Sequence, residues 1–275
     1  MAYRSIVFVA AGDGADRTAL EETAMFAARS GASLRVVPAF ADAAANYLAF
    51  GATMKRDAAN AAAEALRRIE QEAQARLEEM ARAAGSAAGV RIEVEERALQ
   101  PGAAVAKASV LADLVVFSSQ SVAGGVCAGL FAETLLDTRA PVLLARKGGT
   151  AKRIAVAWDG SVEAGRALRA ALPMLQQSEE VLILSNGDDI GAEAAATEQE
   201  KLEVYLARHS VANVRAQTTT GRSVAASLLD AAQRNRCDVL VSGAYGRPRL
   251  YEWILGGTTR ALVSAGDGPS LLLAH

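Results

Sequence analysis

The chain contains two copies of one sequence pattern, and this internal repeat is the strongest constraint on its fold. The matched segments are residues 4–12 and 152–160, residues 113–118 and 238–243, and residues 140–145 and 268–274. Three matched strand-like segments in the same order predict two copies of one domain. A short polar and glycine-containing linker, residues 147–151, separates them. We therefore expect one domain over residues 1–147 and a second over residues 152–275.

Within each copy, short apolar runs alternate with longer segments of helical pattern. The expected strands are residues 4–10, 33–39, 90–97, 114–118 and 142–146, then 152–158, 180–185, 212–218, 238–242 and 270–274. Strands that alternate with helices form a parallel sheet covered on both faces. Thr18 and Glu21 have capping-box spacing at the start of a helix over 17–30. An Ala/Glu/Arg-rich stretch, 53–84, predicts a long helix that either covers one sheet face or contributes to an oligomer contact.

Composition narrows the class of protein. Hydrophobic residues make up 51% of the 275 residues, and the net charge is -2. This balance gives no indication of a nucleic acid or an acidic membrane surface as partner. The chain lacks an apolar stretch of about 18 residues and a secretory leader pattern, so we expect a cytoplasmic protein. Of the two cysteines, Cys237 is expected in the core and Cys127 in a loop, partly exposed.

The segment 242–263 in the second copy has glycines at both ends of a loop. Its small residues are Ser242, Gly243, Gly246, Gly256, Gly257, Thr258 and Thr259. Glycine permits a positive φ and the close approach of a ligand, and the free N–H groups that begin a helix favour an anion. The pattern therefore predicts a phosphate cradle of backbone amides, with the two threonine hydroxyls beside it. A tight turn and a closely packed helix would need the same glycines, so that alternative stays open.

The spacing Gly-x2-Gly-x9-Gly after the fourth strand of the second copy resembles the nucleotide-binding motif of the universal stress protein family. In that family the motif holds the ribose and phosphates of ATP, and Ser or Thr directly follows the third glycine. Here Gly257 takes that place and Thr258 comes after it. The resemblance extends over nearly the whole chain and implies a tandem member. Its expected fold is α/β, with two flavodoxin-like or Rossmann-like domains packed as a pseudo-dimer. Each domain is expected to be a five-stranded parallel sheet of order 3-2-1-4-5.

Further candidate residues lie where the first two strands of the second copy end, because ligands of such sheets bind beyond the carboxyl ends of the strands. Asp159 fits a helix start, or by resemblance a contact to the ribose or to a phosphate-bound Mg²⁺. Ala157 and Trp158 match family positions that flank adenine, although Trp158 also fits the core. Asn186 matches the other adenine-side position.

The first copy departs from the motif. Ser118 and Ser121 stand where the second copy has its first two glycines, and only Gly129 resembles the final pair. We therefore predict a degenerate first site and one working site in the second copy. A variant pocket formed by Asp13 with residues 124–125 stays open.

The resemblance implies a stress-response protein that binds ATP, or ADP or AMP, in its second domain, with little or slow hydrolysis. The sequence has no Gly-x4-Gly-Lys-Ser/Thr loop, and Asp159 is the one evident general base near the glycines. No catalytic residue is assigned. Two alternatives stay open: a nucleotide-independent interaction scaffold of the same fold, and a slow ATPase. The family's use of its fifth strand in domain contacts implies an intramolecular pseudo-dimer and leaves a homodimer of tandem chains open.

Overall fold

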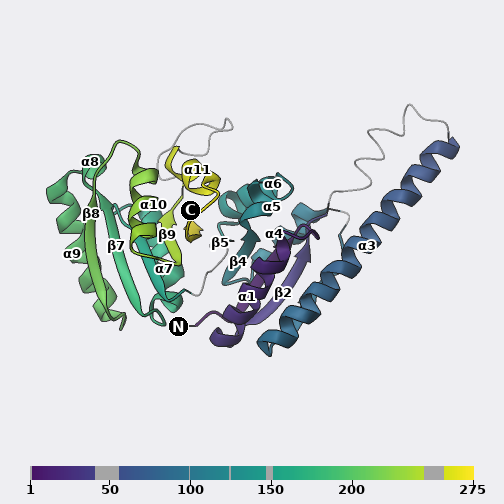
Figure 1. Ribbon diagram of the computed structural model, residues 1–275, viewed down its shortest axis with the longest axis horizontal. Coiled ribbons are helices and arrows are strands. Elements are labelled where there is room, and N and C mark those ends of the chain that lie inside the picture. The colour runs from purple at the N-terminus through teal and green to yellow at the C-terminus, as the bar shows by residue number, and fades with distance from the viewer. Residues whose placement is uncertain (1, 41–55, 99, 124, 147–150, 245–256) are drawn as a thin grey trace.

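The computed structural model describes residues 2–40, 56–98, 100–123, 125–146, 151–244 and 257–275 (Figure 1). The strands of the first copy are β1 (Ser5–Ala10), β2 (Ser33–Pro38), β3 (Ile92–Val94), β4 (Leu114–Ser118) and β5 (Val142–Ala145). Those of the second copy are β6 (Arg153–Ala157), β7 (Glu180–Asn186), β8 (Val214–Thr219), β9 (Val239–Gly243) and β10 (Ser270–Ala274). The expected boundary between the domains includes residues 147–150, which lie outside the described residues, so the boundary stays a prediction.

Helices connect the strands. The first copy has α1 (Asp16–Ser30), α3 (Arg56–Ala88), α4 (Pro101–Ser109), α5 (Ser119–Ala123), α6 (Ala128–Glu133) and the π-helical turn η1 (Thr134–Thr138). The second copy has α7 (Val162–Leu175), α8 (Gly187–Ile190), α9 (Ala192–Arg208), α10 (Val224–Arg234) and α11 (Gly257–Ser264). Among the described residues, no helix is both long enough and apolar enough to cross a membrane.

The strands form one sheet in the order β3-β2-β1-β4-β5-β10-β9-β6-β7-β8. Each copy contributes parallel strands in the predicted order 3-2-1-4-5, so the α/β fold of each half is confirmed. The two expected sheets are not separate, because β5 and β10 pair antiparallel, with Leu143 opposite Leu272. This pairing covers an edge strand of each copy and makes the tandem pseudo-dimer a single sheet (Figure 1).

Two apolar layers lie on the two faces of the sheet. Alternate residues of β1 divide between them, with Ile6 and Phe8 in one layer and Val7 and Val9 in the other. Helices α1, α3, α7 and α9 cover the first face, and α4, α6, α10 and α11 cover the second. Strands buried on both faces must be apolar at nearly every position, which explains the continuous apolar runs in the sequence.

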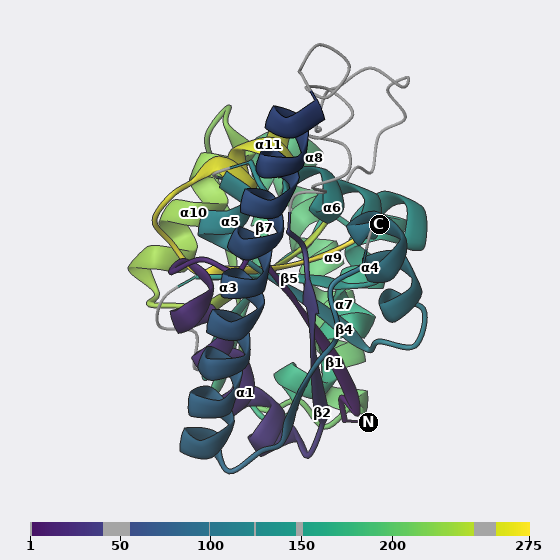
Figure 2. The same cartoon turned by 90° about the vertical axis from the view of Figure 1, so that its right-hand side faces the viewer.

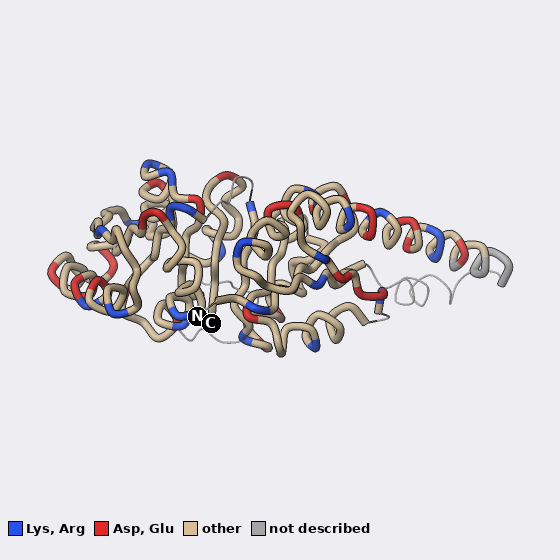
Figure 3. The backbone as a smooth tube through the Cα atoms, turned by 90° about the horizontal axis from the view of Figure 1, so that it is seen from below, with Lys and Arg blue, Asp and Glu red and all other residues tan. Residues whose placement is uncertain are grey.

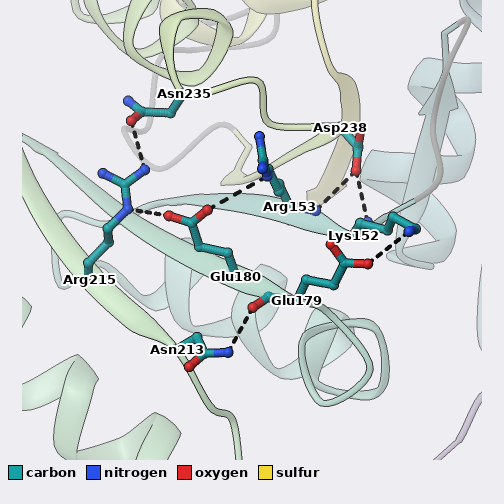
Figure 4. Close-up of polar contacts among 8 residues, drawn as sticks. All are labelled: Lys152, Arg153, Glu179, Glu180, Asn213, Arg215, Asn235 and Asp238. Atoms are coloured by element: carbon teal, nitrogen blue, oxygen red, sulfur yellow. Dashed lines mark hydrogen bonds and ion pairs between the residues drawn. The ribbon is translucent and has the colours of Figure 1, made fainter.

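The repeat extends to individual hydrogen bonds. In the first copy, Asp113 Oδ2 accepts from the backbone N–H groups of residues 4 and 5, at 2.6 and 3.0 Å. In the second copy, Asp238 Oδ2 accepts from the backbone N–H groups of residues 152 and 153, at 2.8 and 3.0 Å (Figure 4). The aspartate that precedes the fourth strand therefore fastens the amino end of the first strand in both copies. Glu180, which pairs with the side chains of Arg153 and Arg215, lies at the same edge of the second copy.

The long helix α3 is confirmed in its described part. Its later turns bury Leu77, Met80 and Ala84 against the first face of the sheet, beside α1. Its earlier turns extend past the sheet in two views (Figures 1 and 2). Arginines and acidic residues follow one another along it (Figure 3). The predicted covering of one sheet face is confirmed, whereas the oligomer contact stays a prediction.

Two local expectations are wrong. Helix α1 begins at Asp16, and its N-cap residue Ala15 makes no side-chain capping bond, so Thr18 and Glu21 do not form the predicted capping box. Instead, the Asp16 carboxylate accepts a hydrogen bond from the backbone N–H of Gly12 in the loop before the helix. Cys127 is fully buried and not partly exposed, because it packs in the apolar layer beneath α6. Both cysteines are free.

Candidate functional site

The candidate residues of the second copy meet at the carboxyl edge of the sheet. The sheet order places β6 between β9 and β7, so Ala157, Asn186 and Gly243 end three adjacent strands. Helix α11 leads into the amino end of β10, which runs parallel to β9, so the first turn of α11 points back to the same edge. The structure therefore places most of the predicted residues at this edge, namely Ala157, Trp158, Asp159, Asn186, Ser242, Gly243, Gly257, Thr258 and Thr259. Gly246 and Gly256 lie outside the described residues.

Trp158 continues the ladder one residue beyond β6. Its backbone N–H donates to Leu184 O at 2.8 Å, and its carbonyl accepts from Ser185 Oγ at 2.7 Å. The indole packs against the apolar layer beneath α7 and α9, which supports a core role for the ring. Among the described residues, its buried Nε1 has no hydrogen-bond acceptor. A buried donor in this state is rare enough in proteins to require an explanation, such as an ordered water or a ligand.

Asp159 begins the turn that leads into α7. Its Oδ1 accepts from Ser161 N at 2.9 Å, and Ser161 Oγ accepts from Ala164 N at 3.2 Å as the N-cap of the helix. Gly160 between them has a φ of 75°, which favours glycine. The helix-start role of Asp159 is therefore evident. The carboxylate is also exposed at the carboxyl edge, where a ligand can reach it.

The side chain of Asn186 is fully engaged within the protein. Its Oδ1 accepts from Asp188 N and Asp189 N, each at 3.0 Å, and thereby caps α8. Its Nδ2 donates to Gly221 O at 3.2 Å and to Ser227 Oγ at 2.8 Å. An amide side chain has two donors and two lone pairs, so these four bonds use all of them. Asn186 can therefore face a ligand only through its backbone.

Gly243 allows a close approach between β9 and α7. A Cβ at this position would lie 2.5 Å from Ala164 N and 2.7 Å from the backbone carbon of Glu163. The neighbouring Ser242 is buried, and its Oγ donates to Gly243 O at 3.0 Å. At this glycine the structure shows the packing role that the sequence left as an alternative.

The first turn of α11 is open. Gly257 and Thr258 are exposed, whereas Thr259 is buried. A Cβ at Gly257 would meet no atom within 4 Å among the described residues, so helix packing does not require glycine there. The first turn contains no acidic residue, and Arg260 is exposed beside it. An α-helix start with this character suits an anion.

Two further residues at this edge were not expected from the sequence. Glu198 of α9 places Oε2 2.8 Å from the position of a Cβ on Gly160, and its carboxylate pairs with Lys201 at 2.6 Å. His275, which follows β10, places Nδ1 2.9 Å from Ala244 O. No local sequence pattern predicts either contact, because both depend on how elements far apart in the sequence pack together.

The matching edge of the first copy is filled by the protein's own side chains. Gly12 has a positive φ of 79°, close to the 75° of Gly160 in the second copy, but a Cβ on Gly12 would overlap the ring of Phe40. The equal register of β2 and β7 against their first strands puts Gly187 in the place of Phe40 in the second copy. Asp16 Oδ2 accepts from Gly12 N at 2.8 Å.

The serines that replace the first two glycines take part in this closure. Ser121 Oγ donates to Asp16 Oδ1 at 3.1 Å, and Ser118 Oγ donates to Ala15 O at 3.0 Å. Asp13, the residue of the possible variant pocket, accepts from Ala15 N at 2.9 Å. These contacts support a degenerate first site, which stays a prediction. Within the described residues of the chain, no group of three or more His, Cys, Asp or Glu side chains could hold a metal ion.

Comparisons with known proteins agree with this arrangement. A search of curated proteins found no match. A universal stress protein from Archaeoglobus fulgidus DSM 4304 is 18% identical, with a TM-score of 0.72 over 98% of this chain and 97% of that one. A functionally unknown protein from Pseudomonas aeruginosa PAO1 is 14% identical, with a TM-score of 0.59 over 99% of this chain and 92% of that one. These likenesses show the fold of the whole tandem chain. Residues 150–273, nearly all of the second copy, match the model of the "Universal stress protein family".

Proposed function

We propose that the second copy binds an adenine nucleotide, with its phosphates at the first turn of α11 and its ribose and base over the ends of β6 and β7. The observation that carries this proposal is the start of α11, where Gly257 and Thr258 are exposed and the described first turn contains no acidic residue. The match of residues 150–273 to the model of the universal stress protein family supports it.

The charges at the edge support one orientation of the nucleotide. Asp159 and Glu198 both lie at the turn after β6, where their carboxylates would repel phosphates but can accept hydrogen bonds from ribose hydroxyls or an exocyclic amine. Arg260 lies at the other side, in the first turn of α11, where its charge favours phosphate. The nucleotide therefore runs from the acidic turn to the basic helix start. A divalent cation bound to the phosphates would reduce the remaining repulsion between them and the two carboxylates.

We expect turnover to be slow. Asp159 is the general base that the sequence suggests, but one of its oxygens already accepts from Ser161 N in the turn. Proton abstraction requires a base within hydrogen-bond reach of an attacking water. A carboxylate that serves to hold a helix start is a poor candidate for that role.

The first experiment is to release and identify any nucleotide that the purified protein carries. Heat-denatured protein is separated by anion exchange against adenine nucleotide standards, and nucleotide-free protein is then titrated with ATP and Mg²⁺. ATP at nearly one equivalent supports a single site in the second copy. ADP or AMP indicates turnover or another ligand. Protein that carries no nucleotide and ignores added ATP contradicts the proposal.

Replacing Thr258 with aspartate is expected to separate anion binding from folding. A carboxylate in the first turn of a helix stabilises it by about 0.3–1 kcal/mol, whereas the same charge repels a phosphate. We expect Thr258→Asp to lower ATP affinity at least about 10-fold while the melting temperature stays the same or rises. The measurements are calorimetric titration and thermal unfolding.

The matched control for this variant is Thr258→Asn, which has nearly the same shape without the charge. It should bind ATP within about 3-fold of the unchanged protein, which is under 1 kcal/mol. Adenosine, which lacks phosphates, should bind both variants alike. Undiminished ATP binding by Thr258→Asp would show that the phosphates lie elsewhere.

One set of observations favours the second candidate, a nucleotide-independent scaffold. In the first copy, the side chains of Phe40 and Asp16 fill the edge where a ligand would bind. In the second copy, every donor and acceptor of the Asn186 side chain is hydrogen-bonded within the protein. A chain that ignores ATP in the titration above, yet keeps its fold, would fit this alternative.

A further inference from the structure

Helix α11 lies between the two copies. It contacts α10 of its own copy and α5 of the first copy, and the three helices are neighbours in the ribbon (Figure 1). Helix α5 follows β4 directly, so it begins where the second copy has its glycine loop after β9. The segment of the first copy that lost the glycine motif therefore packs against the helix that carries the end of the motif in the second.

Arg146, the residue after β5, makes the polar part of this contact. Its Nη2 donates to Leu262 O at 2.7 Å and to Val263 O at 3.4 Å, in the last turn of α11. Its Nη1 donates to Pro269 O at 2.8 Å, and its backbone N–H donates to Ser270 Oγ at 3.0 Å. Only 5% of the residue is exposed.

The partners of Arg146 are carbonyl groups rather than a carboxylate. Among the described residues, no acidic side chain forms an ion pair with it, and the charge of Asp267 acts on it from farther away. The last carbonyls of a helix lack intrahelical donors and carry the negative end of the helix dipole. A buried guanidinium supplies the missing hydrogen-bond donors and a positive charge opposite that end of the dipole. Burial lowers the pKa of Arg146, but an arginine stays charged at neutral pH.

We propose that Arg146 is a positioning residue for the nucleotide site, through which the first copy fixes the helix that holds the phosphates in the second. Helix α11 has 8 residues and is only about 12 Å long, so anchoring its last turn also sets the place of its first turn. Leu262 and Thr259 are buried and hold one side of the helix, and Arg146 fixes its end. This inference rests on the proposed function, because the phosphate contact belongs to that proposal.

Linkage makes the dependence reciprocal. If the contact with the first copy strengthens phosphate binding, then bound nucleotide must strengthen that contact by the same factor. The first copy, which lacks the glycine motif, would then stabilise the binding site of the second copy without binding nucleotide itself.

The test compares Arg146→Gln and Arg146→Lys in the full chain. We expect Arg146→Gln to weaken ATP binding about 10-fold, to leave adenosine binding within about 3-fold, and to speed amide hydrogen exchange in residues 257–264. Arg146→Lys keeps the charge near the carbonyls and should restore part of the ATP affinity. A general loss of protein stability would weaken the binding of ATP and of adenosine alike. Arg146→Lys would then not restore ATP affinity.

Tyr3→Phe is the control, because it removes a hydrogen bond between the copies that lies outside the contact made by Arg146. Tyr3 Oη donates to Ala170 O of α7 at 2.7 Å, away from α11. This variant should change neither ATP affinity nor exchange in α11. Unaltered exchange in residues 257–264 of Arg146→Gln would refute the positioning role whether or not the protein binds nucleotide. Faster exchange with unchanged ATP affinity would refute the link to the site. An unsubstituted chain that binds no ATP would instead refute the proposed function.

Discussion

Replacing Gly243 with alanine is expected to lower the free energy of unfolding by about 3 kcal/mol, roughly 10 °C in melting temperature. The added Cβ would lie 2.5 Å from Ala164 N and 2.7 Å from the backbone carbon of Glu163. Both atoms belong to the backbone of the first turn of α7, so neither can move aside as a flexible side chain could. The helix would have to shift away from β9, which would open the apolar layer beneath it. Thermal unfolding followed by circular dichroism measures the effect.

Gly257→Ala is the control, because a Cβ at that position meets no atom within 4 Å among the described residues. Alanine also has the higher helix propensity, so this variant should be neutral or slightly more stable. If Gly243→Ala unfolds at the same temperature as the unchanged protein, β9 and α7 do not pack as closely as the structure shows. If the expected loss occurs, reduced nucleotide binding by a Gly243 variant is no proof of a ligand contact.

The sequence was sufficient to predict the fold because its signals are local and occur twice. Apolar runs of strand length, such as residues 114–118 and 270–274, became β4 and β10 with the same bounds. The order of the strands followed from the family resemblance and is confirmed in both copies. The union of the two sheets through β5 and β10 has a weaker signal, since the pairing of two edge strands depends on surfaces that the whole domain creates.

The candidate site was predictable in place but not in the role of each residue. Glycine serves both a close backbone contact and a ligand approach, and the structure shows the first at Gly243 and leaves room for the second at Gly257. The four hydrogen bonds of Asn186 join segments up to 41 residues apart, so no window of sequence could reveal them. Phe40 and Glu198 cover the equivalent glycines of the two copies through tertiary packing alone.

The buried carboxyl group of Asp16 is expected to make the stability of the protein depend on pH. Burial is the largest influence and raises its pKa from 3.8 to about 6; the nearby charge of Asp13 adds to this, and hydrogen bonds from Gly12 N and Ser121 Oγ oppose it. Cys127 also faces this group, but burial raises the pKa of its thiol to about 12, so it does not titrate in the same range. The folded state therefore holds the Asp16 proton more tightly than the unfolded state does.

The sign of the effect follows from this difference. Below about pH 4 both states are protonated and the contribution to stability is fully present. As the pH rises through about 6, the folded state must ionise a buried carboxyl group, and about 3 kcal/mol of stability is lost. The direction of this change is opposite to that of a surface carboxylate in an ion pair.

Asp16→Asn is expected to remove this pH dependence. The asparagine Oδ1 can still accept from Gly12 N, and its Nδ2 can donate to Ser121 Oγ, so both contacts survive without a titrating group. Urea unfolding at intervals between pH 4 and 8 should show the two proteins equally stable at the acid end and the variant about 3 kcal/mol more stable at neutral pH. Ser121→Ala, which removes a bond that favours the ionised form, should steepen the loss. A constant difference between Asp16→Asn and the unchanged protein across this range would show that Asp16 ionises normally, and that the closed edge of the first copy is open to water.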